Sequence, residues 1–483
     1  MKLQIISPAG DIHRGKSGIF KRSLRYAPLT LTTLAALVPE DLPAEVTIQD
    51  EGVGPLDLDF EADLVGISAI TGTAPRAYNI ADQLRAKGHT VVLGGVHPTL
   101  LPEEAARHAD AIVTGYAEES WPRLLRDFAV GRLESHYSAH TARQLKVPLA
   151  RRDLLKKKRY ATINSIEATR GCPHRCEFCA VPAAWSGIYA HRPIPDVIAE
   201  LETIEGRHAL FIDLSPVEDV QYAKALYRAM IPLRIRWVGL STTRIADDDE
   251  LLRLAAASGC RGLLIGFESI SQRTLNQTQK HFHSADKYAE AIKKLHDHGI
   301  GIQGCFVFGF DDDDSTVFER TVEFVDRVNI DLPRYAVATP FPGTALYRRW
   351  DAEGRLLHKN WSLYDVEHVV HQPKRMSPEQ LQEGLNWSWQ QSYRWRSIAS
   401  RVWGSRCVMS LSLSLNIGYR FFAKHLPERT GTVYRDSARL PAAPAEPLVL
   451  PHDEPVSNDR SHSNQPGEAV GTLLPAATGE VKL

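Results

Sequence analysis

Cysteine, net charge and long apolar runs are all scarce in this sequence of 483 residues. It has six cysteines, and its 57 basic and 58 acidic residues leave a formal net charge of −1. Few cysteines without a secretory signal argue against a disulfide framework, and balanced charge predicts no electrostatic footprint for nucleic acid or an anionic membrane. The apolar run at residues 3–6 is too short for a signal peptide and predicts a buried strand. We expect a cytoplasmic protein that binds no nucleic acid and has no transmembrane segment.

Hydrophobic residues make up 43% of the chain, enough for the cores of two or three domains. Short apolar runs alternate with helical patterns, which predicts parallel sheets covered by helices. The predicted fold class is α/β, in five segments: a doubly wound, Rossmann-like domain at 1–135, a polar, basic linker at 136–160, an open TIM-like (β/α)6 barrel at 161–372, a helical extension at 373–428, and a disordered tail rich in Pro, Ala, Glu and Ser at 429–483.

Strands and helices are expected at particular positions in both α/β domains. In the first, strands are predicted at 3–6, 46–49, 64–70 and 91–93, and helices near 28–38, 75–87 and 119–128. In the second, strands are predicted at 164–169, 209–213, 235–240, 262–267, 301–308 and 334–338, and helices at 246–257, 284–298 and 315–328. Such sheets bind ligands at the carboxyl ends of their strands, so functional residues are expected there.

The C-terminal helices are unusually aromatic. One helix is predicted to begin with Ser377 as N-cap and Pro378 at its first position, and Trp387, Trp389, Tyr393 and Trp395 follow. These rings either pack on the barrel or form a lid over a bulky apolar substrate. The uncharged stretch at 407–419 has 13 residues, too few to span a bilayer, and predicts a buried or interfacial helix.

Three of the six cysteines are clustered as Cys172, Cys176 and Cys179, after a strand-like run. Thiolates so spaced can converge on one soft metal centre, and a four-iron cluster held by three cysteines leaves one iron open. A structural zinc site would need a fourth ligand, and His174 lies too close to both flanking thiols to serve. Cys260, Cys305 and Cys407 stand alone in apolar contexts, which predicts small buried side chains rather than metal ligands.

At this loop the chain resembles the radical S-adenosylmethionine (SAM) enzymes, whose signature is CxxxCxxC with an aromatic residue, here Phe178, before the last cysteine. The resemblance implies a 4Fe-4S cluster on Cys172, Cys176 and Cys179. In that family the amino and carboxylate groups of SAM chelate the open iron. An electron from the cluster then cleaves SAM to methionine and a 5'-deoxyadenosyl radical.

Later strand ends resemble the SAM site of the same family. Residues 263–269 are similar to its fourth strand, which implies that Glu268 approaches the SAM ribose, although a buried glutamate could merely pair with an arginine. Residues 304–311 are similar to its fifth strand, whose backbone, here near Gly309, runs along the adenine, and residues 339–344 resemble the PxPGT motif after the sixth. The second strand departs from the pattern, and either Asp213 or Ser215 is a candidate for the SAM amino group.

The first domain resembles the cobalamin-binding domain that precedes the radical SAM domain in one large subclass. The similarity lies in residues 66–72, 93–98 and, more loosely, 110–118. It implies that the crevice for the nucleotide tail of the corrinoid is lined by Ser68, Thr71, Gly94 and Gly95. Residues 11–15 are one residue short of the DxHxxG motif that supplies the lower axial cobalt ligand. His13 is therefore a candidate ligand, although a solvated loop histidine is the reading that we favour.

The resemblance, over residues 1–425, implies a cobalamin-dependent radical SAM enzyme that modifies an unactivated carbon of a small apolar metabolite, in the commonest chemistry of the subclass by methylation. A radical SAM cyclase or ring-modifying enzyme and a non-catalytic corrinoid or iron–sulfur binding protein are the alternatives. A tRNA methylthiotransferase would need a second cysteine trio, and residues 1–171 contain no cysteine. The expected partners are an isoprenoid lipid or tetrapyrrole substrate and an electron donor such as flavodoxin or ferredoxin.

Overall fold

The computed structural model describes residues 1–10, 25–139, 147–185, 187–431 and 433. The described residues all belong to one compact unit. The predictions for His13 and for most of the tail at 429–483 therefore fall outside the described residues.

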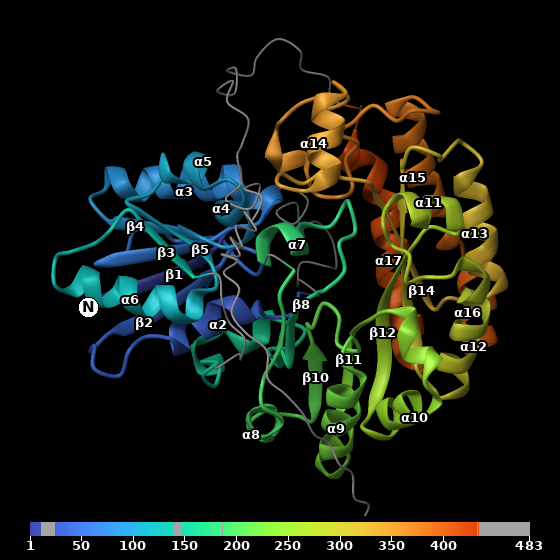
Figure 1. Ribbon diagram of the computed structural model, residues 1–483, viewed down its shortest axis with the longest axis horizontal. Coiled ribbons are helices and arrows are strands. Elements are labelled where there is room, and N and C mark those ends of the chain that lie inside the picture. The colour runs from blue at the N-terminus through green and yellow to red at the C-terminus, as the bar shows by residue number, and fades with distance from the viewer. Residues whose placement is uncertain (11–24, 140–146, 186, 432, 434–483) are drawn as a thin grey trace, which may run out of the picture. The chain divides into compact units, whose positions relative to one another are not determined.

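The N-terminal region is a doubly wound sheet of six parallel strands, as predicted (Figure 1). In chain order the strands are β1 (Lys2–Ser7), β2 (Glu45–Asp50), β3 (Leu64–Ser68), β4 (Thr90–Gly94), β5 (Ala111–Gly115) and β6 (His136–Ala139), and their order in the sheet is β2-β1-β3-β4-β5-β6. The central strands are nearly continuous apolar runs because helices cover both of their faces. The order reverses between β1 and β3, which makes their carboxyl ends the expected ligand site.

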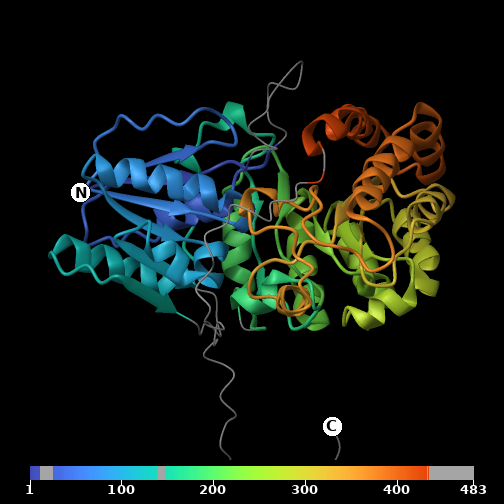
Figure 2. The same cartoon turned by 90° about the horizontal axis from the view of Figure 1, so that it is seen from above.

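Helices cover both faces of this sheet. Figure 1 shows α3 (Ala74–Ala86), α4 (Val96–Leu100) and α5 (Pro102–Ala106) on one face, and α2 (Leu29–Ala36) and α6 (Ala117–Ala129) on the other. One buried apolar cluster joins α3 and α5 to the strands, and a second joins them to α2 and α6. The view from above in Figure 2 shows the same layers.

The second sheet also has six parallel strands, in sequence order. They are β7 (Ser165–Ile166), β10 (His208–Phe211), β11 (Arg236–Ser241), β12 (Cys260–Glu268), β13 (Gly301–Phe308) and β14 (Leu332–Val337). The connecting helices are α8 (Ile194–Glu202), α9 (Val220–Met230), α10 (Asp249–Ala257), α12 (Tyr288–Asp297) and α13 (Val317–Arg327), and the shorter α11 (Gln272–Gln277) and α14 (Ala345–Ala352) follow β12 and β14. Alternate residues of β12 and β13 are buried against these helices or half-buried toward the barrel interior, which confirms the partial-barrel prediction.

Most predicted elements lie within a few residues of the observed ones, and β13 coincides with its prediction. Strand β6 was not predicted: it pairs with β5 and extends the first sheet into the segment expected to be a linker. The antiparallel pair of β8 (Thr169–Gly171) and β9 (Tyr189–His191), which flanks the cysteine loop, was also not predicted.

Three C-terminal helices complete the described chain: α15 (Pro378–Ser392), α16 (Trp395–Ser405) and α17 (Met409–Thr430). Ser377 caps α15 as predicted, by accepting from the Gln380 N–H. Trp389 and Tyr393 are buried and donate to carbonyls of β14, at 3.1 and 2.7 Å, so these two rings pack on the barrel. Trp395 is instead 57% exposed.

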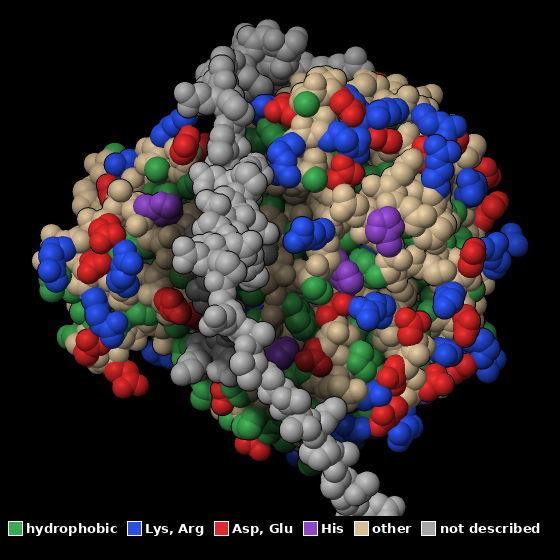
Figure 3. Space-filling model, in the orientation of Figure 1, with side chains coloured by type: hydrophobic (Ala, Val, Ile, Leu, Met, Phe, Trp, Pro, Cys, Tyr) green, Lys and Arg blue, Asp and Glu red, His purple; other side chains and the backbone are tan. Residues whose placement is uncertain are grey.

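The surface charge, the helices and the three isolated cysteines can be compared with what the composition predicts. Basic and acidic side chains are interspersed on the face shown in Figure 3, as the balanced charge predicts. Across the described residues, no helix has the length and apolar character needed to cross a membrane. Cys260 and Cys407 are buried as expected, but Cys305 is only half-buried, because its place on β13 turns it toward the barrel interior.

Candidate active site

The clustered thiols lie on the loop between β8 and α7 (Ala180–Trp185). Cys172, Cys176 and Cys179 are half-buried free thiols, and the Cys179 N–H donates to Cys176 O at 3.1 Å. At the start of the loop Gly171 has a φ of +82°, and a Cβ atom there would lie 1.9 Å from the carbonyl oxygen of Ile188. Only glycine fits, so this residue determines how the chain leaves β8 for the thiol loop.

The middle of the loop is anchored to the helices that follow β12 and β14. The Glu177 N–H donates to Thr278 O, and the Leu346 N–H donates to Glu177 O, each at 3.0 Å. Arg349 Nε donates to Glu177 Oε1 at 2.6 Å. The Phe178 ring packs 5.6 Å from that of Phe310, between centroids. The loop is therefore held in place by protein contacts alone.

The chemistry of the three thiols fits a metal cluster. Burial raises the pKa of Cys176 to about 12 and that of Cys179 to about 11, and it also raises the pKa of Cys172, whereas the nearby Lys280 ammonium lowers all three. Because metals bind thiolates, a positively charged centre has to displace these protons. Within the described ranges, no three His, Cys, Asp or Glu side chains, the thiols of this loop included, are placed to hold a single metal ion.

Glu268 ends β12 close to the thiol loop. Its φ is +62°, a left-handed conformation at a register shift between β12 and β13. Lys280 Nζ donates to Glu268 Oε1 and to the carbonyl oxygen of Gly266, both at 2.7 Å. The partner of this glutamate is thus a lysine rather than the arginine that we considered. Its role as a SAM contact stays a prediction.

The two candidates after β10 have different surroundings. Asp213 is buried and accepts from the backbone N–H groups of Ala168 and Thr169 and from the Thr169 hydroxyl. Burial raises the pKa of Asp213 to about 7, although these hydrogen bonds act to lower it. Ser215 lies beside Cys172 and donates to Glu218 Oε1 at 2.7 Å. Ser215 is therefore the candidate that reaches the thiol loop, whereas Asp213 holds the strand before it.

Gly309 forms the turn after β13. Its φ is +97°, and a Cβ atom would lie 2.6 Å from Leu381 Cδ2. Its N–H donates to Asp313 Oδ2, and its carbonyl oxygen lies 3.0 Å from His371 Nε2. These contacts fix the backbone at which the adenine contact is predicted.

The four residues predicted to line the corrinoid crevice meet at one edge of the first sheet. Ser68 pairs in register with Gly94 at the ends of β3 and β4. Gly95 has a φ of +101°, and a Cβ atom there would lie 2.7 Å from the Ala69 carbonyl oxygen. Thr71 begins the short helix η2 (Thr71–Thr73) and is buried. Their contact with a corrinoid remains a prediction.

A buried polar chain connects this edge with the segment before α15. Thr71 Oγ1 lies 3.3 Å from His97 Nδ1, and His97 Nε2 lies 3.2 Å from Glu104 Oε1. Trp361, in the short helix η8 (Trp361–Leu363), donates to Glu104 from Nε1 at 3.1 Å. Burial favours a higher pKa for Glu104, but the hydrogen bonds from His97, Trp361 and Tyr78 outweigh it and lower the pKa.

A second link joins the thiol loop to the end of β5. Arg170, two residues before Cys172, donates to Glu118 Oε1 at 2.5 Å and to Glu167 Oε2 at 2.6 Å. Glu118 ends the segment at 110–118 that matched the corrinoid-binding pattern loosely. The two predicted cofactor regions are therefore tied together by an ion pair.

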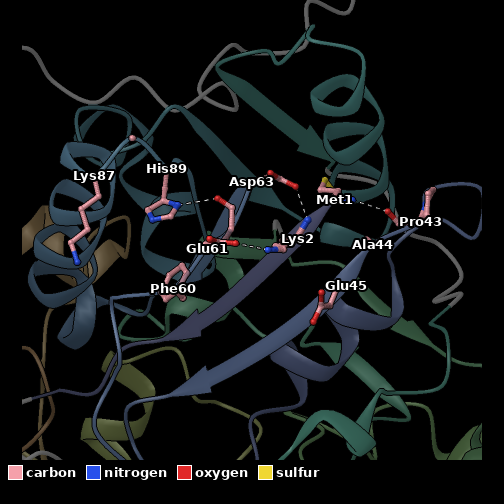
Figure 4. A pocket seen from close by; sticks show the side chains of 12 residues that line it. Met1, Lys2, Pro43, Ala44, Glu45, Phe60, Glu61, Asp63, Lys87 and His89 are labelled. Carbon is pink, nitrogen blue, oxygen red and sulfur yellow. Dashed lines mark hydrogen bonds and ion pairs between the residues drawn. The ribbon is translucent and has the colours of Figure 1, made fainter.

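A shallow depression lies at the amino ends of β1 and β2, the edge of the sheet opposite the predicted crevice (Figure 4). Its charged side chains are paired: Lys2 Nζ lies 2.6 Å from Glu61 Oε2, and the Lys2 N–H donates to Asp63 Oδ2. His89 Nδ1 lies 2.9 Å from the Ala62 carbonyl oxygen. None of the predicted site residues lines it.

Several side chains near the site were not found from the sequence. Lys280 follows α11, and it belongs to no sequence motif that would mark it as functional. Glu218 lies 3.0 Å from His174 Nε2 and also binds Arg244, in an arrangement that only the fold brings together. His97 does have a signal in the sequence, because it lies two residues after Gly95, within the segment at 93–98 that resembles the corrinoid-binding pattern.

Comparison with known protein families identifies both domains. The radical SAM superfamily matches residues 166–325, and the B12 binding domain matches residues 26–125. The chain is 32% identical over 417 residues to bacteriochlorophyllide d C-12(1)-methyltransferase of Chlorobaculum tepidum, covering 83% of this chain and 90% of that protein. It is 30% identical to the C-8(2)-methyltransferase of the same organism, covering 86% and 95%.

The fold is also found among solved structures. The radical SAM methyltransferase TsrM from Kitasatospora setae, with cobalamin and a [4Fe-4S] cluster bound, superposes with a TM-score of 0.59 at 17% identity. The match covers 73% of this chain and 78% of that one. This similarity shows a shared arrangement of the two domains and the helical C-terminal region.

Proposed function

The chain belongs to the cobalamin-binding radical SAM enzymes, and from that premise we propose that it methylates an unactivated carbon of a tetrapyrrole related to the bacteriochlorophyllides. The observation that supports this substrate class is the similarity, over more than four-fifths of the chain, to two methyltransferases named for bacteriochlorophyllide d. The cofactors are a 4Fe-4S cluster, SAM and cobalamin.

The protein's own residues hold and shield these groups. When bound, the cluster and SAM supply a 5'-deoxyadenosyl radical that removes one hydrogen atom from the substrate carbon, and methylcobalamin supplies the methyl group that replaces it. We assign cluster binding to Cys172, Cys176 and Cys179. We also assign the SAM ribose to Glu268, whose contact with Lys280 supports the assignment, and the SAM amino group to Ser215, which lies beside Cys172.

We assign the corrinoid to the edge of the first sheet formed by Ser68, Thr71, Gly94 and Gly95. The Arg170–Glu118 ion pair supports this assignment, because it connects the thiol loop to the same sheet and so limits the separation of the two cofactors. A functional boundary between the two α/β domains then falls after β6, within residues 140–160. We further propose an external one-electron donor of the flavodoxin or ferredoxin type.

The proposal is tested with anaerobically reconstituted protein, bacteriochlorophyllide d, SAM and reduced flavodoxin. We expect 5'-deoxyadenosine together with a product heavier by one methylene group, both measured by mass spectrometry. Protein prepared without cobalamin should form 5'-deoxyadenosine but no methylated product, since hydrogen abstraction needs only the cluster and SAM. Methylation without cobalamin, or an absence of 5'-deoxyadenosine in the complete system, would contradict the proposal.

A further inference from the structure

One row of side chains crosses the interior of the barrel from the predicted SAM site to β14. Gly266 pairs in register with Cys305, and Cys305 pairs with Arg334. Their neighbours Phe306 and Tyr335 are buried, and Tyr335 contacts Trp389 of α15 on the outer side. By the alternation of strands, Gly266, Cys305 and Arg334 face the interior. The Glu268 carboxylate and the Lys280 ammonium lie over Gly266, so the row runs from these charges across Cys305 to the arginine.

Arg334 of β14 makes no hydrogen bond or ion pair with the part of the chain that the structure describes. Other arginines of the barrel region are paired: Arg192 with Glu200, Arg355 with Asp311 and Arg401 with Asp326. Gln303, the preceding inward residue of β13, already binds the Tyr419 hydroxyl at 2.7 Å.

One oxygen of a carboxyl group near Arg334 also has no hydrogen-bond partner among the described residues. Glu367 is 4% exposed, and its Oε2 atom makes no hydrogen bond within the described chain. It is close enough to interact electrostatically with Arg334 without forming an ion pair. Val366, just before it, has a φ of +66°, which is strained for a β-branched residue. Asp365 holds this loop by accepting from the N–H groups of Glu367 and His368, each at 3.0 Å.

A half-buried guanidinium with no partner among the described residues, in partly apolar surroundings, is suited to binding an anion. Burying such a charge without a partner is costly, whereas a carboxylate can accept two parallel hydrogen bonds from the guanidinium fork. Leu264, Val307 and Ala336 also face inward on these strands, so the surroundings are apolar. The other end of the row reaches Glu268 and Lys280, beside the thiols.

We propose that Arg334 binds a carboxylate of an apolar substrate and so directs the substrate body along the row toward the SAM site, with Glu367 as the second polar group of that subsite. The inference deepens the proposed function, on which it rests for the location of the substrate in the barrel. It assigns the substrate class as apolar carboxylic acids.

The test compares acids with their methyl esters in the holoenzyme. Fluorescence titration measures the Kd of bacteriochlorophyllide d, which has a free carboxylate, of its methyl ester, and of parinaric acid and its methyl ester. We expect the wild type to bind at least one acid about tenfold or more tightly than its ester. The preference should disappear in Arg334→Gln and be partly retained in Arg334→Lys, which keeps the charge but loses the planar fork.

A matched control is Arg236→Gln, on an exposed arginine at the amino end of β11, which should keep the preference. Iron content and the bound cobalamin spectrum verify that each variant is folded. The wild-type comparison of acid with ester needs no variant. Equal binding of both acids and their esters, no binding of any probe, or a preference that persists in Arg334→Gln would overturn the inference.

The two proposals fail in different ways. If bacteriochlorophyllide d is bound and methylated but its ester behaves identically, and parinaric acid shows no preference either, the inference is wrong and the proposed function stands. If bacteriochlorophyllide d and its ester do not bind, whereas parinaric acid binds in an Arg334-dependent manner, the carboxylate subsite stands and the tetrapyrrole proposal is wrong.

Discussion

At the residue scale, the six cysteines are all free thiols and differ in where the fold places them. Three share one anchored loop, two are buried among apolar side chains, and Cys305 faces the barrel interior. Burial raises the pKa of Cys260 and of Cys305 to about 12, so both stay protonated thiols. Among the described cysteines, only Cys172, Cys176 and Cys179 share one loop.

The first prediction follows from this division. Replacing Cys172, Cys176 and Cys179 together by Ala should abolish the cluster, because three thiolates are its only proposed protein ligands. The cluster content is measured as iron and acid-labile sulfide per chain and by the visible absorbance. Cys260→Ala is the control, since that buried thiol lies outside the loop and should leave the iron content unchanged. Full iron in the triple variant would show that the ligands are elsewhere.

A second residue-scale prediction concerns pH. Burial raises the pKa of Glu367 to about 7, and the groups that act on it are Arg334 of β14, Asp365 and His368 of its own loop, and Arg429 of α17. Below pH 7 the carboxyl group is neutral and leaves Arg334 available. Above pH 7 it is ionised, competes for Arg334 and repels an anionic ligand.

The Kd of an acid ligand that depends on Arg334 should therefore rise by up to about tenfold per pH unit above 7, as for any single coupled proton. Glu367→Gln should remove this dependence, because the amide does not ionise. Titrations from pH 6 to 9, a range in which the ligand's own carboxylate stays ionised, measure it. A pH-independent wild type, or an unchanged slope in Glu367→Gln, would contradict the assignment.

At the element scale, the adjacent glycines at the end of β4, Gly94 and Gly95, differ in how well each position would accept a side chain. A Cβ atom on Gly95 would lie 2.7 Å from the Ala69 carbonyl oxygen, and its φ of +101° disfavours any side chain. A Cβ atom on Gly94 would make ordinary contacts of 3.5 and 3.6 Å with Val113. The first glycine thus leaves room at the strand end, and the second is needed for the turn.

We expect Gly95→Ala to weaken hydroxocobalamin binding strongly, because the turn must shift against the chain after β3. Gly94→Ala is the matched control and should bind nearly as the wild type does. A bulkier change, Gly94→Phe, should again prevent binding if its ring enters the space of the nucleotide tail. Absorbance titration of the apoprotein measures all three. Normal binding by both Gly95→Ala and Gly94→Phe would place the corrinoid elsewhere.

At the scale of the whole molecule, two polar links join the corrinoid-binding sheet to later parts of the chain. Arg170 pairs with Glu118, and Glu104 joins His97 to Trp361. Methyl transfer requires that the two cofactors act on one substrate, so their relative placement matters more than the strength of either link.

Trp361→Phe removes the indole N–H that binds Glu104 and keeps an aromatic ring. We expect 5'-deoxyadenosine formation to continue, while the ratio of methylated product to 5'-deoxyadenosine falls several-fold, because displacements of about 1 Å are costly for group transfer. Both products are measured in one assay. Trp403→Phe, on a side chain that is 71% exposed, is the control. An unchanged ratio would show that the Glu104 link does not position the cofactors.

Local pattern in the sequence determined the elements and the cofactors of this protein. Apolar runs and turn residues predicted ten of the fourteen described strands, but not β5, β6, β8 or β9. The cysteine spacing indicated the cluster. Hydrophobic periodicity and loop ligands are encoded by residues near one another in the chain. The partner of Glu268, the ion pair of Glu118 with Arg170 and the surroundings of Arg334 were decided only by the tertiary structure. Each depends on strands that are distant in sequence and adjacent in the sheet: Cys305 and Arg334 are neighbours because β13 pairs with β14 in that register. A single arginine in a strand carries no periodic signal. Whether it pairs with an acidic side chain, lies exposed or can bind an anionic ligand depends on which residues the fold places next to it.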